Sequence, residues 1–249
     1  MASPEAEKAV VGVLPVGEIH VWRVRLVPPS EPWSLLSNDE RARGNGFRSV
    51  HDRHRFVAAR STLRQILGSY VGIRPEHLQF EYGPNGKPSL LGSSLRFNVS
   101  HAADMALYAV CVGTEVGVDL EMSSVLLDPE SVVRRCMTKR ERRLLDRVDP
   151  ESRDDAVLTT WVRKEAVAKG RGEGLGLDLA LIHTRPDLPA EATAVKVGTS
   201  PRDKWFVCDV PVGTGGAGAV ATQEKGFQVR YLSTSSLLPK VGAAASLAP

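Results

Sequence analysis

The most informative stretch of this 249-residue chain is WVRKEAVAK, residues 161–169. It has no Gly or Pro before position 170 and is rich in Ala, Lys, Glu and Arg, a composition that favours a helix. Trp161, Glu165 and Lys169 follow one another at intervals of four residues, so they lie along one side of that helix. An aromatic core anchor with an ordinary Glu–Lys pair would give the same stripe. Two motifs upstream favour a chemical role instead.

The first of these motifs is VGVDLE, residues 116–121, which reads as a strand. Asp119 and Glu121 are two residues apart, so their carboxylates point to the same face. Two carboxylates on one face repel each other unless a cation lies between them, and Mg²⁺ is a cation that such oxygen ligands bind. Glu165 could complete the set from the neighbouring helix. Taken alone, Asp-x-Glu is a weak signal that more often marks a solvated strand face.

The second motif is FNVSH, residues 97–101, which the pattern places at the end of a strand and before a turn of small residues. Backbone N–H groups and an imidazole can meet an anion at such a place. A turn histidine with a structural hydrogen bond is the alternative for Ser100 and His101.

Two cationic positions accompany these motifs. Arg55 lies near the start of a helix predicted over residues 51–70, where it could also be ordinary solvated charge. Lys87 lies in GPNGKP, residues 83–88, where a loop Lys and a rigid Pro88 can flank a flat ring. A simple turn is the alternative there.

The composition excludes several classes of protein. A hydrophobic content of 42% and a charged content of 24% are those of a soluble globular protein. The net charge of +3 tolerates an anionic ligand or an acidic partner, but scattered basic residues and 6% aromatics do not indicate a nucleic-acid binder. Three widely spaced cysteines imply neither a disulfide framework nor a zinc site, so we expect a cytoplasmic protein. The apolar run at residues 9–16 is too short to span a membrane.

The predicted elements occur in the order strand, helix, strands, and this order is repeated in the second half. We therefore expect an α+β fold of two similar lobes, with no repeat visible in the letters themselves. The expected parts are an N-terminal α+β lobe at residues 1–114, a C-terminal α+β lobe with the metal site at residues 115–232, and a disordered tail at residues 233–249.

The three motifs, in this order and spacing, resemble those of the Sfp-type 4′-phosphopantetheinyl transferases. The similarity extends to Arg55 and to Gly86-Lys87-Pro88, and it covers about residues 17–232. It implies a monomer of two α+β lobes related by a pseudo-twofold, with coenzyme A in the groove between them. It also implies transfer of the phosphopantetheine arm of coenzyme A to a serine of an acyl or peptidyl carrier protein, with release of adenosine 3′,5′-bisphosphate. Such carriers serve fatty-acid, polyketide or nonribosomal peptide synthesis.

Carried over to this sequence, the resemblance implies a role for each matching position. Asp119, Glu121 and Glu165 would bind Mg²⁺, or Mn²⁺ in its place. Glu165 and Lys169 would be catalytic, and Lys169 would also reach the pyrophosphate.

The resemblance also implies the contacts of coenzyme A. Ser100 and His101 would contact its phosphates, and Arg55 its 3′-phosphate. Gly86, Lys87 and Pro88 would lie along the adenine. Arg41 and Arg43 stand where the family often offers lysines to the 3′-phosphate, on a short helix predicted from the capping box of Ser37 and Glu40. The alternative function is a coenzyme A or nucleotide-binding module that transfers nothing.

Overall fold

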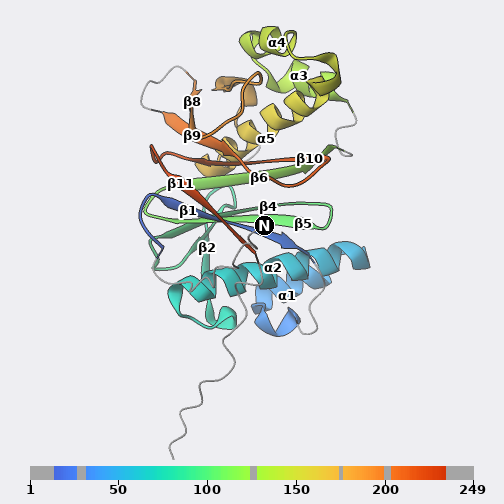
Figure 1. Ribbon diagram of the computed structural model, residues 1–249. Coiled ribbons are helices and arrows are strands. Elements are labelled where there is room, and N and C mark those ends of the chain that lie inside the picture. The colour runs from blue at the N-terminus through green and yellow to red at the C-terminus, as the bar shows by residue number, and fades with distance from the viewer. Residues whose placement is uncertain (1–13, 27–31, 124–127, 174–175, 199–202, 234–249) are drawn as a thin grey trace, which may run out of the picture.

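The computed structural model describes residues 14–26, 32–123, 128–173, 176–198 and 203–233. Two β-sheets are stacked face to face, with α2 and α1 on the outside of one and α5, α3 and α4 on the outside of the other (Figure 1). The tail expected from residue 233 onward lies outside the described residues, apart from Ser233 itself. No helix in the described ranges is long and apolar enough to cross a membrane.

The first sheet has four strands, and the helix α2 (Val50–Val71) lies against it. Its strands, in spatial order, are β11 (Gln228–Ser233), β1 (Glu18–Arg25), β5 (Met105–Val112) and β4 (Leu95–Ala102). The short elements of this half are η1 (Pro32–Leu35), α1 (Asn38–Asn45), η2 (Pro75–His77), β2 (Phe80–Tyr82) and β3 (Pro88–Leu90).

The second sheet has five strands, and the helix α5 (Arg153–Arg171) lies against it. Its strands, in spatial order, are β6 (Val116–Met122), β10 (Gly216–Thr222), β9 (Lys204–Asp209), β8 (Thr193–Val197) and β7 (Ile182–His183). The helices α3 (Pro129–Cys136) and α4 (Lys139–Leu145) and the turns η4 (Pro150–Ser152) and η6 (Leu179–Leu181) complete this half.

The two lobes repeat one arrangement of strands, as the predicted α+β fold with a pseudo-twofold requires. In the first sheet β1 pairs antiparallel with β5, which pairs antiparallel with β4. In the second sheet β6 pairs antiparallel with β10, which pairs antiparallel with β9. In both lobes the long helix comes after the first of these three strands in the chain: α2 after β1, and α5 after β6. The internal repeat is therefore present in the topology, although the letters do not show it.

The last strand crosses between the lobes. The range 227–232, expected in the C-terminal lobe, instead contributes β11 to the first sheet, where it pairs in parallel with β1. Alternating apolar residues predict a strand but do not specify the sheet that it joins. The crossing ties the end of the described chain to its beginning.

Three apolar layers hold the stack together. Alternation along β1 sends Val21 into the layer between the two sheets and Trp22 into the layer under α2. Val118 belongs to the layer between the sheets, whereas Trp205 packs with α5 on the outer face of the second sheet. The second sheet is therefore covered on both faces, and residues of β6 that point away from Val118 meet α5.

Candidate active site

The predicted carboxylates lie on adjacent elements, β6 and α5. Asp119 and Glu121 alternate with residues buried between the sheets, so both point toward α5. Asp119 is 1% exposed, while Glu121 and Glu165 are half-buried. The side of α5 that carries Glu165 also carries Lys169, as the spacing predicted.

Asp119 is the centre of a hydrogen-bonded triad. Its Oδ1 accepts a hydrogen bond from the Nζ of Lys169 at 2.5 Å and another from the Oγ of Ser100 at 2.9 Å. The Nζ of Lys169 also donates to the Oγ of Ser100 at 2.8 Å. Lys169 thus pairs with a carboxylate on β6, whereas the helical spacing alone suggested Glu165 as its partner.

The other oxygen of Asp119 is an orphan. Among the described residues nothing donates a hydrogen bond to the buried Oδ2. An unpartnered buried carboxylate oxygen is costly, and a cation is one group that satisfies it. The environment of Asp119 therefore fits a metal ligand.

The two neighbouring carboxyl groups, Glu121 and Glu165, both have raised pKa values. Burial, and then the charge of Asp119, raise the pKa of Glu121 to about 7, to which Glu165 also contributes. Burial and the charge of Asp119 likewise raise the pKa of Glu165, against the hydrogen bond that Trp161 Nε1 donates to its Oε1 at 3.3 Å. The described residues nevertheless contain no group of three His, Cys, Asp or Glu already arranged to hold a metal. The donor set fits Mg²⁺, which completes its shell with water and phosphate oxygens.

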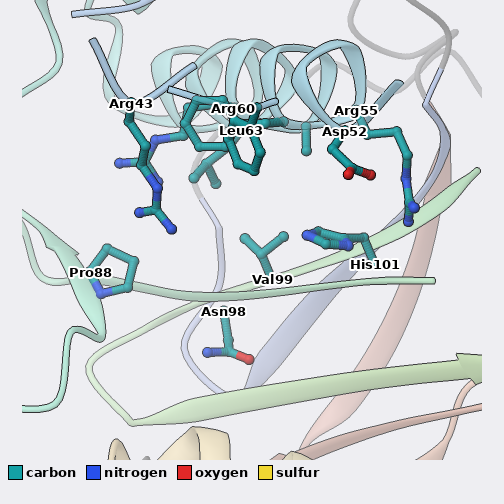
Figure 2. Close-up of a pocket in the computed structure, with 12 residues that line it drawn as sticks. Arg43, Asp52, Arg55, Arg60, Leu63, Pro88, Asn98, Val99 and His101 are labelled. Carbon is teal, nitrogen blue, oxygen red and sulfur yellow. The ribbon is translucent and has the colours of Figure 1, made fainter. Parts of the chain in front are cut away.

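A cavity of about 470 Å³ lies between α2 and β4 (Figure 2). Val99 and His101 point up from β4 toward α2, whereas Asn98 points the other way. The Oδ1 of Asn98 accepts a hydrogen bond from the backbone N–H of Val118 at 2.9 Å, which joins the edges of the two sheets. The lining consists of Arg43, Phe47, Asp52, Arg55, Phe56, Ala59, Arg60, Leu63, Pro88, Asn98, Val99 and His101.

Ser100 and His101 belong to β4 itself, not to a loop after it. The strand extends to Ala102, which pairs with Met105 across a two-residue turn where Ala103 has a φ of 50°. Strand alternation therefore separates the two residues of the motif. Ser100 is buried against Asp119, whereas His101 faces the cavity.

One end of the cavity is lined by Arg55, Asp52 and His101 (Figure 2). The Nε of Arg55 is buried and has no hydrogen-bond partner within the described ranges. Removal from water, and then the charge of Arg55, lower the pKa of His101, which favours the neutral imidazole. An anion at this end would meet the guanidinium of Arg55, with the Asp52 carboxylate beside it.

Of the two arginines of α1, only Arg43 lines the cavity, at its other end. Arg43 lines the wall, and its guanidinium lies 5.4 Å from the centre of the Phe56 ring. Arg41 instead donates to the carbonyl oxygen of Ser34 at 3.2 Å. A buried carboxylate, Glu40, holds α1 in place through ion pairs with Arg60 and Arg64 of α2.

Gly86, Lys87 and Pro88, in and after the turn before β3, have different surroundings. Pro88 lines the main cavity, and Gly86 lines a smaller one beside Arg43. The ammonium of Lys87 is directed away from both, toward Glu115 and the end of α5. Lys87 therefore does not line either of these cavities, because adjacent residues at the start of a strand point to opposite sides.

Lys164 has a structural position that sequence reasoning missed, although it lies in the motif that identified the helix. It is fully buried and donates to Glu141 Oε2 at 2.7 Å and to the carbonyl oxygens of Leu179 and Ile182. Glu141 also accepts two hydrogen bonds from Thr184. The one hint of this position in the sequence was the capping box of α4, in which Thr138 pairs with the same residue, Glu141. This pair fixes α4 and β7 to α5.

Two family models and several curated relatives match the chain. The 4′-phosphopantetheinyl transferase superfamily matches residues 115–222, and the N-terminal region of 4′-phosphopantetheinyl transferases matches residues 27–113. The 4′-phosphopantetheinyl transferase HetI of Nostoc sp. is 34% identical over 227 residues, which cover 86% of this chain and 91% of HetI. The putative 4′-phosphopantetheinyl transferase slr0495 of Synechocystis sp. is 33% identical over 145 residues, 57% of this chain and 59% of that protein.

Two more distant similarities are also found. The human L-aminoadipate-semialdehyde dehydrogenase-phosphopantetheinyl transferase is 25% identical over 169 residues, 61% of this chain and 55% of that protein. A crystal structure of Thermotoga maritima holo-[acyl-carrier-protein] synthase overlaps 45% of this chain and 63% of its own, with 22% identity and a TM-score of 0.36. The assignment rests on the sequence matches, which span both lobes and nearly all of HetI. By those matches, the chain belongs to the 4′-phosphopantetheinyl transferase family.

Proposed function

We propose that this protein transfers the 4′-phosphopantetheine arm of coenzyme A to a serine of an acyl or peptidyl carrier protein, in a Mg²⁺-dependent reaction. The observation that carries the proposal is Asp119, a buried carboxylate with one oxygen bound to Lys169 and the other without a donor. It lies beside Glu121 and Glu165, whose raised pKa values reflect burial and the surrounding negative charge. Mere binding of a nucleotide would not require this arrangement.

Coenzyme A would occupy the cavity between α2 and β4. Its 3′-phosphate would be bound by Arg55 at one end, with Arg43 as a further cation of the wall. Pro88 would pack along the adenine. His101, whose pKa is lowered by burial and then by the charge of Arg55, would donate or accept a hydrogen bond at the phosphates.

Asp119, Glu121 and Glu165 would hold Mg²⁺, or Mn²⁺ in its place. The bound ion would neutralise charge on the pyrophosphate of coenzyme A. Ser100 donates to Asp119 and so orients that carboxylate. We infer that Ser100 acts through Asp119 and does not contact a phosphate itself.

The transfer forms one P–O bond and breaks another. The hydroxyl oxygen of the carrier serine attacks the β-phosphorus, and adenosine 3′,5′-bisphosphate leaves with the oxygen that joined its 5′-phosphorus to the β-phosphorus. Glu165, directly or through a water, accepts the serine proton. Lys169 stabilises the negative charge that develops on the leaving group.

The carrier protein would approach a basic surface on α3 and α4. Six basic residues there are exposed, and an acidic partner would be steered toward them. They are Arg134, Arg135, Lys139, Arg140, Arg142 and Arg143. We further propose a cytoplasmic monomer with a lobe boundary at residues 114–115.

The alternative function is a module that binds coenzyme A and transfers nothing. Incubating the protein with Mg²⁺, a carrier protein and coenzyme A labelled on its thiol separates the two. Covalent label on the carrier supports the transferase. Label that remains bound to this protein but never reaches any carrier in a broad panel supports the module.

A further inference from the structure

The ammonium group of Lys87 is fully engaged by the protein. It donates to Glu115 Oε2 at 2.6 Å, to the carbonyl oxygen of Gly170 at 2.6 Å and to that of Val116 at 3.3 Å. An ammonium has three N–H donors, so these acceptors use all of them. The side chain is 18% exposed, although it leaves a surface turn. Lys87 therefore has no donor left for a ligand.

These bonds join the first lobe to the end of α5. The last carbonyls of a helix lack partners within the helix, and a cation there is stabilised by the helix dipole. Lys87 supplies that cation at Gly170, and Asn85 Nδ2 donates to the carbonyl oxygen of Gly172 at 2.9 Å. A methyl group on Gly172 would lie 3.1 Å from Cδ of Lys87, so the stem of the lysine also packs across the helix end.

Lys87 lies next in sequence to a residue that lines the proposed coenzyme A cavity, and its ammonium contacts the end of the helix that carries Lys169. Pro88, the next residue, lines the cavity, and Lys169, which binds Asp119, immediately precedes Gly170. The turn that carries Lys87 is thus connected to both halves of the proposed site.

We propose that Lys87 is a positioning residue that fixes the last turn of α5, and so the ammonium of Lys169, relative to the turn that carries Pro88. The proposal deepens the proposed function and rests on it, because it concerns how the two lobes keep that site aligned. Glu115 supports the arrangement, since its second oxygen accepts from Arg96 of β4 at 3.2 Å.

The test compares Lys87→Met with Lys87→Arg, which can still donate to Glu115 and Gly170, and with Lys225→Met, an exposed lysine in the turn before β11. Steady-state kinetics with a carrier protein and Mg²⁺ give kcat and the KM for coenzyme A. Displacement of Lys169 should lower kcat of Lys87→Met about tenfold or more, with a smaller change in KM. Lys87→Arg should recover most of kcat, and Lys225→Met should behave as wild type.

A second measurement does not depend on activity. Amide hydrogen exchange of the last turn of α5 should be faster in Lys87→Met than in wild type, with Lys225→Met unchanged. If the wild-type protein transferred nothing, the proposed function would fail, and this exchange would still decide the role of Lys87.

Two outcomes overturn the proposal. A raised KM for coenzyme A with unchanged kcat would make Lys87 a direct ligand of coenzyme A. Unchanged exchange at the end of α5 in Lys87→Met would show that the lysine does not hold the helix.

Discussion

Gly117 of β6 and Gly170 of α5 meet backbone to backbone. A methyl group on Gly117 would lie 1.9 Å from the carbonyl oxygen of Ala166 and 2.3 Å from the N of Gly170. A methyl group on Gly170 would lie 2.4 Å from the ring of Trp205. The helix therefore lies directly on the strand, and this close approach is what brings Asp119 to Lys169.

We expect Gly117→Ala to push α5 away from β6. The obstructing atoms belong to the backbone, so overpacking should lower the free energy of unfolding by about 3 kcal/mol and strongly reduce transfer. Gly176→Ala is the control, because a methyl group there meets nothing within 4 Å. Chemical denaturation checks the first effect, and a Gly117→Ala protein as stable and active as Gly176→Ala would refute the close contact.

Arg55→Ala should weaken the binding of coenzyme A rather than slow the chemistry. A hydrogen bond between a guanidinium and a phosphate contributes about 1.5–3 kcal/mol, so the KM for coenzyme A should rise about tenfold or more with little change in kcat. Dephospho-coenzyme A, which lacks the 3′-phosphate, should be insensitive to the substitution.

The matched control is Arg41→Ala, since Arg41 bonds to Ser34 and does not line the cavity. If Arg55→Ala loses equally with coenzyme A and with dephospho-coenzyme A, Arg55 does not bind the 3′-phosphate. If Arg41→Ala raises the KM for coenzyme A more than Arg43→Ala does, Arg41 and not Arg43 is the arginine of α1 that binds coenzyme A.

The sequence predicted the elements that carry the site better than the contacts among them. The helix with Glu165 and Lys169 and the strand with Asp119 and Glu121 follow from local periodicity. The bond between Lys169 and Asp119 could not be predicted this way, because it joins residues 50 positions apart. The same limit applies to β11, whose pattern predicts a strand but not the sheet that it joins.

The burial of charged side chains could not be predicted from the sequence either. Lysine is normally a surface residue, so nothing in the letters marked Lys164 as fully buried or Lys87 as bound to a helix end. Both depend on carbonyl groups that only the folded backbone brings together. For Ser100 and His101, the strand is longer than predicted because its turn is only two residues long.

Stability should depend on pH through Glu40. Burial raises its pKa, but the hydrogen bond from Arg64 and the charge of Arg60 outweigh that effect and leave the pKa below its usual value. A lowered pKa means that the charged form contributes stability above the unfolded-state pKa of about 4.3, which is lost as pH falls through the folded-state pKa. Glu40→Gln should therefore lower Tm at pH 7, where a broken buried pair costs about 3 kcal/mol.

The difference in Tm between Glu40→Gln and wild type should shrink below about pH 4, as wild type also loses the charge. Thermal unfolding followed by circular dichroism from pH 7 to pH 3 measures it, with the exposed Glu81→Gln as control. A difference that stays constant over this range would exclude Glu40 as the source.

The basic surface on α3 and α4 should act on the carrier protein and not on coenzyme A. Arg140 and Arg143 are exposed, and changing both to Glu should raise the carrier KM at low salt and leave the coenzyme A KM unchanged. Exposed charges are screened beyond about 8–10 Å near physiological salt, so the effect should fade as salt rises from about 0.05 to 0.5 M.

The control is the double change of Lys196 and Lys204 to Glu, which alters net charge equally on paired strands of the second sheet. An unchanged carrier KM in the Arg140/Arg143 variant at low salt would make the surface an ordinary solvated helix face.

The most direct test of the account is the mass of a carrier protein after incubation with coenzyme A and Mg²⁺. With the wild-type protein we expect the carrier to gain the phosphopantetheine arm, and chelation of the metal should prevent the gain. Asp119→Asn and Glu165→Gln should remain folded and leave the carrier almost unmodified. If these variants modify the carrier as fast as wild type at limiting Mg²⁺, the central claim that transfer requires the carboxylates of Asp119 and Glu165 is contradicted.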